Sequence, residues 1–120
     1  MNVLIVESNA GLAGLWRRHL ERGHAMVDIA PDQDSAIEYL QNARPDVIVL
    51  DLFLEAGSAI AVADYASYRR PDAKIVFVTN TSFFSDGSIF NHIPNACAYL
   101  QSGTPPEDLT AIVEHYGSVH

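Results

Sequence analysis

The chain has 120 residues, of which 48% are hydrophobic and 18% charged, and its formal net charge is −8. This length and composition predict one soluble globular domain over residues 1–120. The chain has only seven Lys and Arg residues, so we expect no nucleic-acid partner. It has no apolar run near the roughly 20 residues of a membrane helix, so we expect no membrane partner. MNVLIVES has no features of a signal peptide, and the single Cys97 excludes an internal disulfide, so a cytoplasmic protein is expected.

Short apolar runs rich in β-branched residues alternate along the chain with segments of helical periodicity. Caps and helix breakers separate the two kinds of segment. In chain order the sequence predicts a strand over 3–6, a helix from the Asn9 cap to Gly23, a strand over 25–29, a helix around 36–40 that closes before Pro45, a strand over 47–50, a helix over 58–69 stopped by Pro71, a strand over 75–78, a short helix within 85–92, a strand over 96–100, and a last helix that ends at Gly117.

The last helix has the clearest start signal in the sequence. Thr104-Pro105-Pro106-Glu107 has the spacing of a capping box, with proline in the first turn. Apolar residues then recur at helical spacing from Leu109 to Tyr116. The sequence therefore predicts that the Thr104 side chain caps this helix.

Five strand–helix units predict an α/β fold, a doubly wound five-stranded parallel sheet of the flavodoxin-like kind. The common strand order for this number of units is 2-1-3-4-5. Functional sites in such sheets lie beyond the carboxyl ends of the strands, where the order reverses between the first and third strands. The residues that follow Val6 and Leu50 are therefore the expected location of the chemistry.

Two acidic residues stand at these positions, since Glu7 follows the first strand and Asp51 follows the third. Carboxylates that meet at one edge repel each other unless a cation or a chemical role offsets the cost. They are therefore candidate ligands of a hard cation, most simply Mg²⁺. Alternatively, both are solvated polar ends of strands.

The whole chain resembles the receiver domain of two-component response regulators. The segments that carry the resemblance are LIVESN, DVIVLDLFLEAGS, IVFVTN and AYLQSGTPPEDL. The resemblance implies a domain whose aspartate takes a phosphoryl group from a histidine kinase in a phosphorelay. The resemblance implies a signalling domain that is not an enzyme. The sequence also has no glycine motif of the kind that binds nucleotides.

Position by position, the resemblance implies a role for each residue that matches the family's pattern. Asp51 matches the phosphoacceptor, Glu7 matches the first acid of the Mg²⁺ site, and the Phe53 carbonyl stands where a further metal ligand is expected. Thr79 matches the hydroxyl that bonds the phosphoryl oxygens, and Tyr99 matches the aromatic residue that reorients on activation.

The chain departs from the family's pattern at three positions of this site. Ser8 replaces the second acid, so Mg²⁺ binding is expected to be weak or absent. Ser102 replaces the lysine that pairs with the phosphoryl group, and Gly103 replaces the proline after it. Lys74, the only lysine, is predicted at the opposite edge of the sheet. Glu55 either lends a carboxylate to the site or faces solvent, the second being favoured.

These departures leave two signalling functions open. In the first, Asp51 is phosphorylated and the output is a protein contact, the expected output if the chain is complete. In the second, the chain is a pseudo-receiver, an adaptor that binds a protein without phosphorylation. The expected partner surface includes Phe83, Phe84, Phe90 and Tyr99, and a homodimer through the same face is a further expectation.

Overall fold

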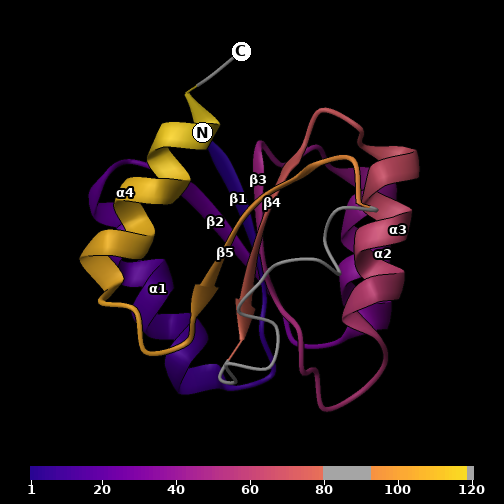
Figure 1. Cartoon of the computed structure of the whole chain (residues 1–120), viewed down its shortest axis with the longest axis horizontal. Coiled ribbons are helices and arrows are strands. Elements are labelled where there is room, and N and C mark those ends of the chain that lie inside the picture. Colours follow the sequence, from indigo (N-terminus) through magenta and orange to yellow (C-terminus); the bar gives the residue numbers. More distant parts are fainter. Residues whose placement is uncertain (80–92, 119–120) are drawn as a thin grey trace.

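The computed structural model describes residues 1–79 and 93–118, in which strands and helices alternate (Figure 1). The predicted short helix within 85–92 lies outside the described residues. The described elements are β1 (Asn2–Val6), α1 (Ala10–Arg22), β2 (Met26–Ala30), α2 (Gln33–Asn42), β3 (Val47–Asp51), α3 (Ala59–Arg69), β4 (Lys74–Thr79), β5 (Ala96–Gln101) and α4 (Pro106–Gly117).

The five strands form one parallel sheet in the order β2-β1-β3-β4-β5, which confirms the predicted fold class and strand order. Each strand is a short, mostly apolar run, as expected where helices cover both faces of a parallel sheet. In Figure 1, α1 and α4 lie on one side of the sheet, and α2 and α3 lie on the other. All strand carboxyl ends therefore meet at one edge, called here the carboxyl edge.

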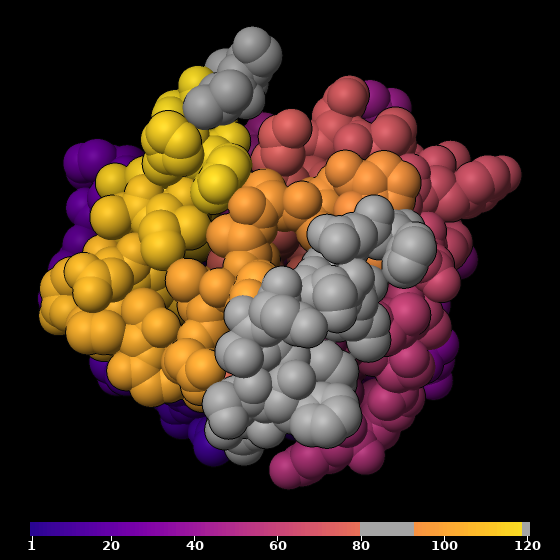
Figure 2. Space-filling model, viewed as in Figure 1, coloured from indigo at the N-terminus to yellow at the C-terminus, as the bar shows by residue number. Residues whose placement is uncertain are grey.

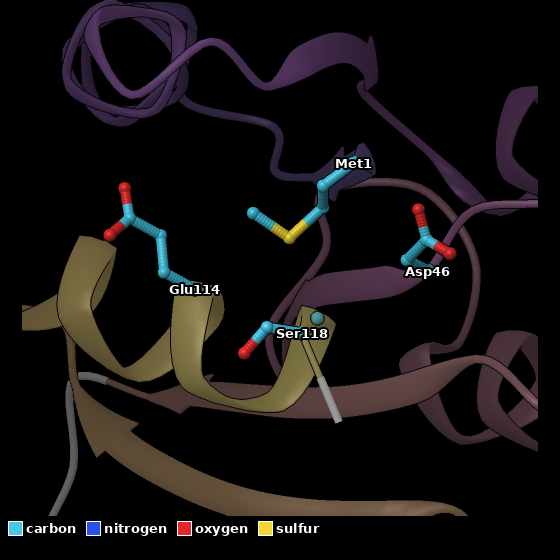
Figure 3. A pocket seen from close by; sticks show the side chains of 5 residues that line it. Met1, Asp46, Glu114 and Ser118 are labelled. Carbon is cyan, nitrogen blue, oxygen red and sulfur yellow. The ribbon is translucent and has the colours of Figure 1, made fainter. Parts of the chain in front are cut away.

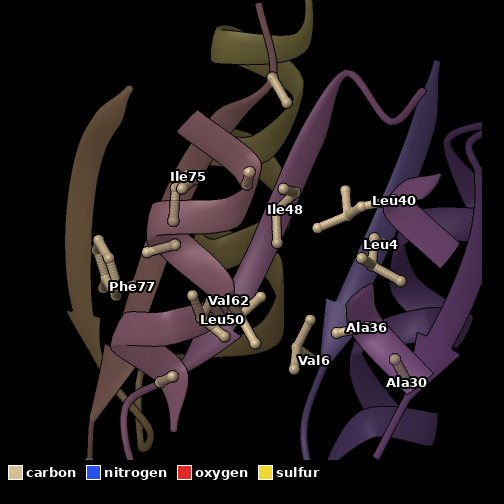
Figure 4. Close-up of a cluster of buried hydrophobic side chains, with 14 of the residues drawn as sticks. Leu4, Val6, Ala30, Ala36, Leu40, Ile48, Leu50, Val62, Ile75 and Phe77 are labelled. Atoms are coloured by element: carbon tan, nitrogen blue, oxygen red, sulfur yellow. The ribbon is translucent and has the colours of Figure 1, made fainter. Parts of the chain in front are cut away.

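Each face of the sheet carries its own hydrophobic core. Between the sheet and α2 and α3, Leu4, Leu50 and Phe77 are completely buried (Figure 4). Between the sheet and α1 and α4, Trp16 and Leu20 are 1% and 0% exposed. Because successive strand residues point to opposite faces, the same short strands supply both cores. Trp16, the single tryptophan of the sequence, therefore belongs to the core on the α1 and α4 side.

The first helix begins and ends where the sequence predicts. The Asn9 side chain accepts a hydrogen bond from the Leu12 amide at 3.0 Å, and Gly23 is the C-cap residue. The second strand begins one residue later than predicted, at Met26, because the Ala25 amide still bonds to the Leu20 carbonyl at the end of α1.

The predicted Thr104 capping box is wrong. The N-cap of α4 is Pro105, with φ −53° and ψ 138°, and no side chain caps the helix. The Thr104 amide instead bonds to the Gln101 carbonyl, which places Thr104 in the turn that leaves β5. The helix therefore starts one residue too late for Thr104 to reach its free amides.

The strand β5 lies at the edge of the sheet and is only partly buried. Its register with β4 shifts between Ile75 and Val76, which pair with Ala96 and Ala98 and leave Cys97 as the additional residue of an irregularity. Cys97 is half-buried, and burial raises the pKa of its thiol to about 11. The space-filling view shows β5 and α4 side by side on one face (Figure 2).

The N-terminus packs against the end of α4, at the edge opposite the strand carboxyl ends. Met1, Asp46, Glu114, Gly117 and Ser118 line an open hollow of about 420 Å³ there (Figure 3). A methyl group at Gly117 would overlap the Met1 sulfur, so the close approach of these segments favours glycine. Among the described residues, no helix is long and apolar enough to span a bilayer.

Candidate functional site

The carboxyl edge brings together the acidic residues that the sequence places after the first and third strands. Asp51 is the last residue of β3, and Glu7 directly follows the neighbouring strand β1. The Glu7 amide still bonds to the Ala30 carbonyl at 3.1 Å, so its backbone continues the sheet ladder. Thr79 ends β4, on the other side of β3.

Glu7 is a buried carboxyl group, with only 3% of its surface exposed. Its Oε2 atom accepts a hydrogen bond from the Asn9 amide at 3.1 Å, whereas its buried Oε1 atom has no hydrogen-bond partner among the described residues. Burial, followed by interaction with the Asp51 carboxyl, raises the pKa of Glu7 from 4.5 to about 7. An unsatisfied buried oxygen is costly, and a bound cation or proton would relieve that cost.

Asp51, at the end of β3, is only partly buried. Its Oδ1 atom accepts a hydrogen bond from the Phe53 amide at 2.9 Å. The Leu52 amide bonds to the Val78 carbonyl at 2.8 Å, which extends the β3–β4 ladder past Asp51. The Phe53 amide thus orients one oxygen of the Asp51 carboxylate, and the carboxyl group of Glu7 interacts with the same side chain.

The Glu7 and Asp51 carboxylates fit a Mg²⁺ ion that keeps most of its water. Mg²⁺ is commonly held by one or two carboxylates with several water ligands. The buried, unsatisfied Oε1 atom of Glu7 is the observation that favours a cation here. No group of three or more His, Cys, Asp or Glu residues gathers in the described part of the chain, so a cage made of side chains is not present there.

The Ser8 hydroxyl, which stands in place of the second acid, is engaged in two loop contacts. It donates to the Pro31 carbonyl at 2.7 Å and accepts from the Glu55 amide at 3.0 Å. The Glu55 side chain is exposed, in agreement with the expectation that it faces solvent. Position 8 therefore joins two loops at the carboxyl edge and supplies no carboxylate.

None of the seven Lys and Arg residues in the sequence follows the carboxyl end of a strand. Lys74 is the first residue of β4, at the opposite edge, as the sequence predicts. Ser102 and Gly103 follow β5, and a Cβ added at Gly103 would meet nothing within 4 Å. The edge thus brings Glu7 and Asp51 together, with no Lys or Arg directly after a strand end of the described residues.

The two residues matched to the activation switch lie on neighbouring strands. Thr79 is 1% exposed, and the Ser102 amide bonds to its carbonyl at 2.7 Å. Tyr99 pairs with Phe77 in the β4–β5 register and packs, partly buried, against the core on the α2 and α3 side. Phe83, Phe84 and Phe90 lie outside the described residues.

One contact at this edge was not anticipated from the sequence. Gln33, at the start of α2, bonds to both ends of a short stretch before α3: its amide donates to the Ala56 carbonyl at 3.2 Å, and its Oε1 accepts from the Ser58 amide at 2.8 Å. Gly57, between them, has φ +92°. The Gly-Ser pair before α3 is the signal that suggests such a turn.

Comparison with known proteins identifies a family that covers most of the chain. The model of the response regulator receiver domain family matches residues 3–113. The photosynthetic apparatus regulatory protein RegA of Rhodobacter capsulatus is 29% identical over 119 residues, which cover 87% of this chain and 64% of RegA. The chain thus spans less than two thirds of that relative.

Two solved structures share the fold. A CheY-like receiver domain protein from Methanospirillum hungatei has a TM-score of 0.87 at 22% identity, with 97% of this chain and 92% of that chain covered. The response regulator TrrA from Thermotoga maritima, solved in complex with Mg²⁺ and BeF, has a TM-score of 0.83 at 20% identity, with coverage of 96% and 97%. From the family match and this shared architecture, the chain belongs to the response regulator receiver domain family.

Proposed function

We propose that this chain is a single receiver-like domain over residues 1–120 that accepts a phosphoryl group on Asp51 and passes the signal on by protein contact. One observation carries the proposal: a partly buried Asp51 carboxylate, oriented by the Phe53 amide, interacts with the buried carboxyl group of Glu7, whose Oε1 atom has no hydrogen-bond partner among the described residues. This pair occupies the topological switch point, the usual place of function in such sheets.

The chemistry needs a nucleophilic carboxylate oxygen and relief of negative charge. An Asp51 oxygen attacks the phosphorus atom of the donor, a phosphorus–oxygen bond forms, and the bond to the donor's leaving group breaks. Glu7 and Asp51 would hold Mg²⁺, which offsets charge on the phosphoryl oxygens. TrrA, solved with Mg²⁺ and BeF, supports this role. Ser8 contributes no ligand charge, so weak Mg²⁺ binding is part of the proposal.

Receiver domains act with histidine kinases and other signalling proteins. We assign the donor role to such a kinase, in the cytoplasm, and the output to the face that includes Tyr99 and α4. Tyr99 is partly exposed on the edge strand β5, which lies beside α4 on the surface (Figure 2). A homodimer through this face is the second form of output, and sedimentation velocity before and after phosphorylation measures it.

The direct test is the intact mass of the protein after incubation with Mg²⁺ and an acyl phosphate. The expected result is a phosphoryl adduct on the wild-type chain and none on Asp51→Asn. A matched control, Asp64→Asn, removes an exposed carboxylate from α3 and should leave the adduct unchanged. Equal adducts on the wild type and Asp51→Asn would place the phosphoryl group elsewhere and refute the assignment.

A second function is favoured by the distribution of positive charge. A phosphorylated Asp51 would carry about −1.5 to −2 charges, by analogy with other phosphorylated side chains. No Lys or Arg follows a strand end to pair with it. If no adduct forms and beryllofluoride changes no amide chemical shift at Thr79 or Tyr99, the chain is a pseudo-receiver adaptor that binds a protein without phosphorylation.

A further inference from the structure

The loop that joins β3 to α3, residues 52–58, follows Asp51 directly, and its second half is held by hydrogen bonds to Ser8 and Gln33. Ser8 accepts a hydrogen bond from the Glu55 amide at 3.0 Å. Gln33 bonds to the Ala56 carbonyl at 3.2 Å and to the Ser58 amide at 2.8 Å. The β3–α3 loop therefore has fixed partners within the protein, and its backbone polar groups are satisfied without a bound ligand at these positions.

A hydroxyl group satisfies both contacts of position 8, and a carboxylate does not. The Ser8 oxygen donates its proton to the Pro31 carbonyl and accepts the proton of the Glu55 amide. A carboxylate at this position has no proton for the Pro31 carbonyl and would repel it, so it would not keep the place from which Ser8 accepts the Glu55 amide. The replacement of an acid by serine thus does more than remove charge, because it joins the loop after β2 to the loop after β3.

We propose that Ser8 is a positioning residue that holds the β3–α3 loop beside Asp51 by direct hydrogen bonds, in place of order imposed by a divalent cation. In this arrangement the loop keeps its position whether or not Mg²⁺ binds to Glu7 and Asp51. The consequence for Asp51 chemistry rests on the proposed function, whereas the loop contact itself does not.

Amide hydrogen exchange at Glu55, measured by NMR, tests the proposal in the full chain. In wild type, the exchange rate with a chelator should equal that with excess Mg²⁺. Ser8→Ala should raise it about fivefold to tenfold, the effect of losing one ordinary hydrogen bond. Ser8→Thr, which keeps the hydroxyl, should restore slow exchange. Ser102→Ala, which removes a hydroxyl at the same edge, should leave it unchanged.

A fourth variant should make the position of the loop depend on Mg²⁺. In Ser8→Asp, a third carboxylate joins Glu7 and Asp51 and the bond to Pro31 is lost, so Glu55 exchange should be fast with chelator and slow with Mg²⁺. The chemical shift of the Glu55 amide should then follow Mg²⁺ concentration, which it should not do in wild type. This comparison holds even if Ser8→Ala folds poorly.

Two results would overturn the proposal. One is a wild-type Glu55 amide that exchanges freely with chelator and slows with Mg²⁺, since the cation would then order the loop. The other is unchanged Glu55 exchange in a folded Ser8→Ala variant. Neither depends on phosphorylation: absence of a phosphoryl adduct on Asp51 would refute the proposed function and leave the exchange results intact.

Discussion

At the scale of single residues, one substitution changes both the charge and the connectivity of the carboxyl edge. Ser8 supplies a hydroxyl that bonds to Pro31 and Glu55 where the family's pattern has an acid. Its neighbour Glu7 is left as a buried carboxyl with one unsatisfied oxygen. The cost of burying that charge is therefore met by protonation or by a cation, and it should be visible in the stability of the protein.

Glu7→Gln should remove a pH dependence of folding stability. Because the folded-state pKa of Glu7, about 7, lies above its ordinary value of 4.5, the stabilisation is complete below pH 4.5 and is lost as pH rises through about 7. Relative to the variant, wild type should lose up to about 1 kcal/mol per pH unit in this window. Urea unfolding in chelator-treated buffer at several pH values measures the difference.

The matched control for this titration is Glu55→Gln, which changes an exposed carboxylate at the same edge. Its stability should follow that of wild type across the window. If the free energies of unfolding of wild type and Glu7→Gln changed in parallel with pH, Glu7 would not titrate between pH 4.5 and about 7.

Ser102→Lys should strengthen the response of a phosphorylated Asp51. Ser102 follows β5, two strands from Asp51 at the same edge, and a lysine there supplies the missing ammonium group. Beryllofluoride should then shift the amide resonances of Thr79 and Tyr99 further than in wild type. Ser102→Gln, a long side chain without charge, is the control. An equal response in wild type and Ser102→Lys would mean that the missing cation is not what limits the switch.

At the scale of elements, the β3–α3 loop depends on one backbone conformation. Gly57 has φ +92°, and a methyl group there would overlap the Cβ of Gln33, the residue that bonds to Ala56 and Ser58. Ser58 in turn caps α3 by accepting from the Ala61 amide at 3.2 Å. The turn, the helix cap and the α2 contact are therefore coupled through one glycine.

Gly57→Ala should lower the free energy of unfolding by about 1–3 kcal/mol, through backbone strain and the overlap with Gln33. Chemical denaturation compares it with Gly103→Ala, where the added methyl group meets nothing within 4 Å and the loss should be small. Equal stability of the two variants would show that the turn before α3 relaxes freely.

At the scale of the whole molecule, two separate cores share one sheet. Leu50 points into the core against α2 and α3, and Val49 points into the core against α1 and α4. Since β3 lies at the centre of the sheet order, neither core can lose its strands without exposing the other. The two faces should therefore unfold as one cooperative unit.

Leu50→Ala should lower the free energy of unfolding by about 2–5 kcal/mol. The midpoint should shift equally by circular dichroism and by fluorescence of Trp16, the single tryptophan, which lies in the opposite core. Met26→Ala, which truncates a side chain that is 70% exposed, is the control. A Trp16 midpoint that stays at its wild-type value would mean that the two cores unfold independently.

The fold and the position of the candidate site can be predicted from local patterns in the sequence. Strand and helix periodicity depend on neighbours a few residues away, so the alternation of elements can be read locally. The switch-point rule then predicts, from the strand order alone, that Glu7 and Asp51 meet at one edge. The capping box at Thr104 was misassigned because the pattern does not show which residue starts the helix.

The construction of the candidate site depends on contacts between segments that lie far apart in the chain. The contacts of Ser8 join positions 8, 31 and 55, and those of Gln33 join positions 33, 56 and 58. No local pattern encodes the approach of loops that far apart in the chain. The burial of Glu7, which raises its pKa, likewise depends on packing by several segments. Charge and residue type are properties of the sequence, whereas desolvation and hydrogen-bond partners exist only once the loops have met.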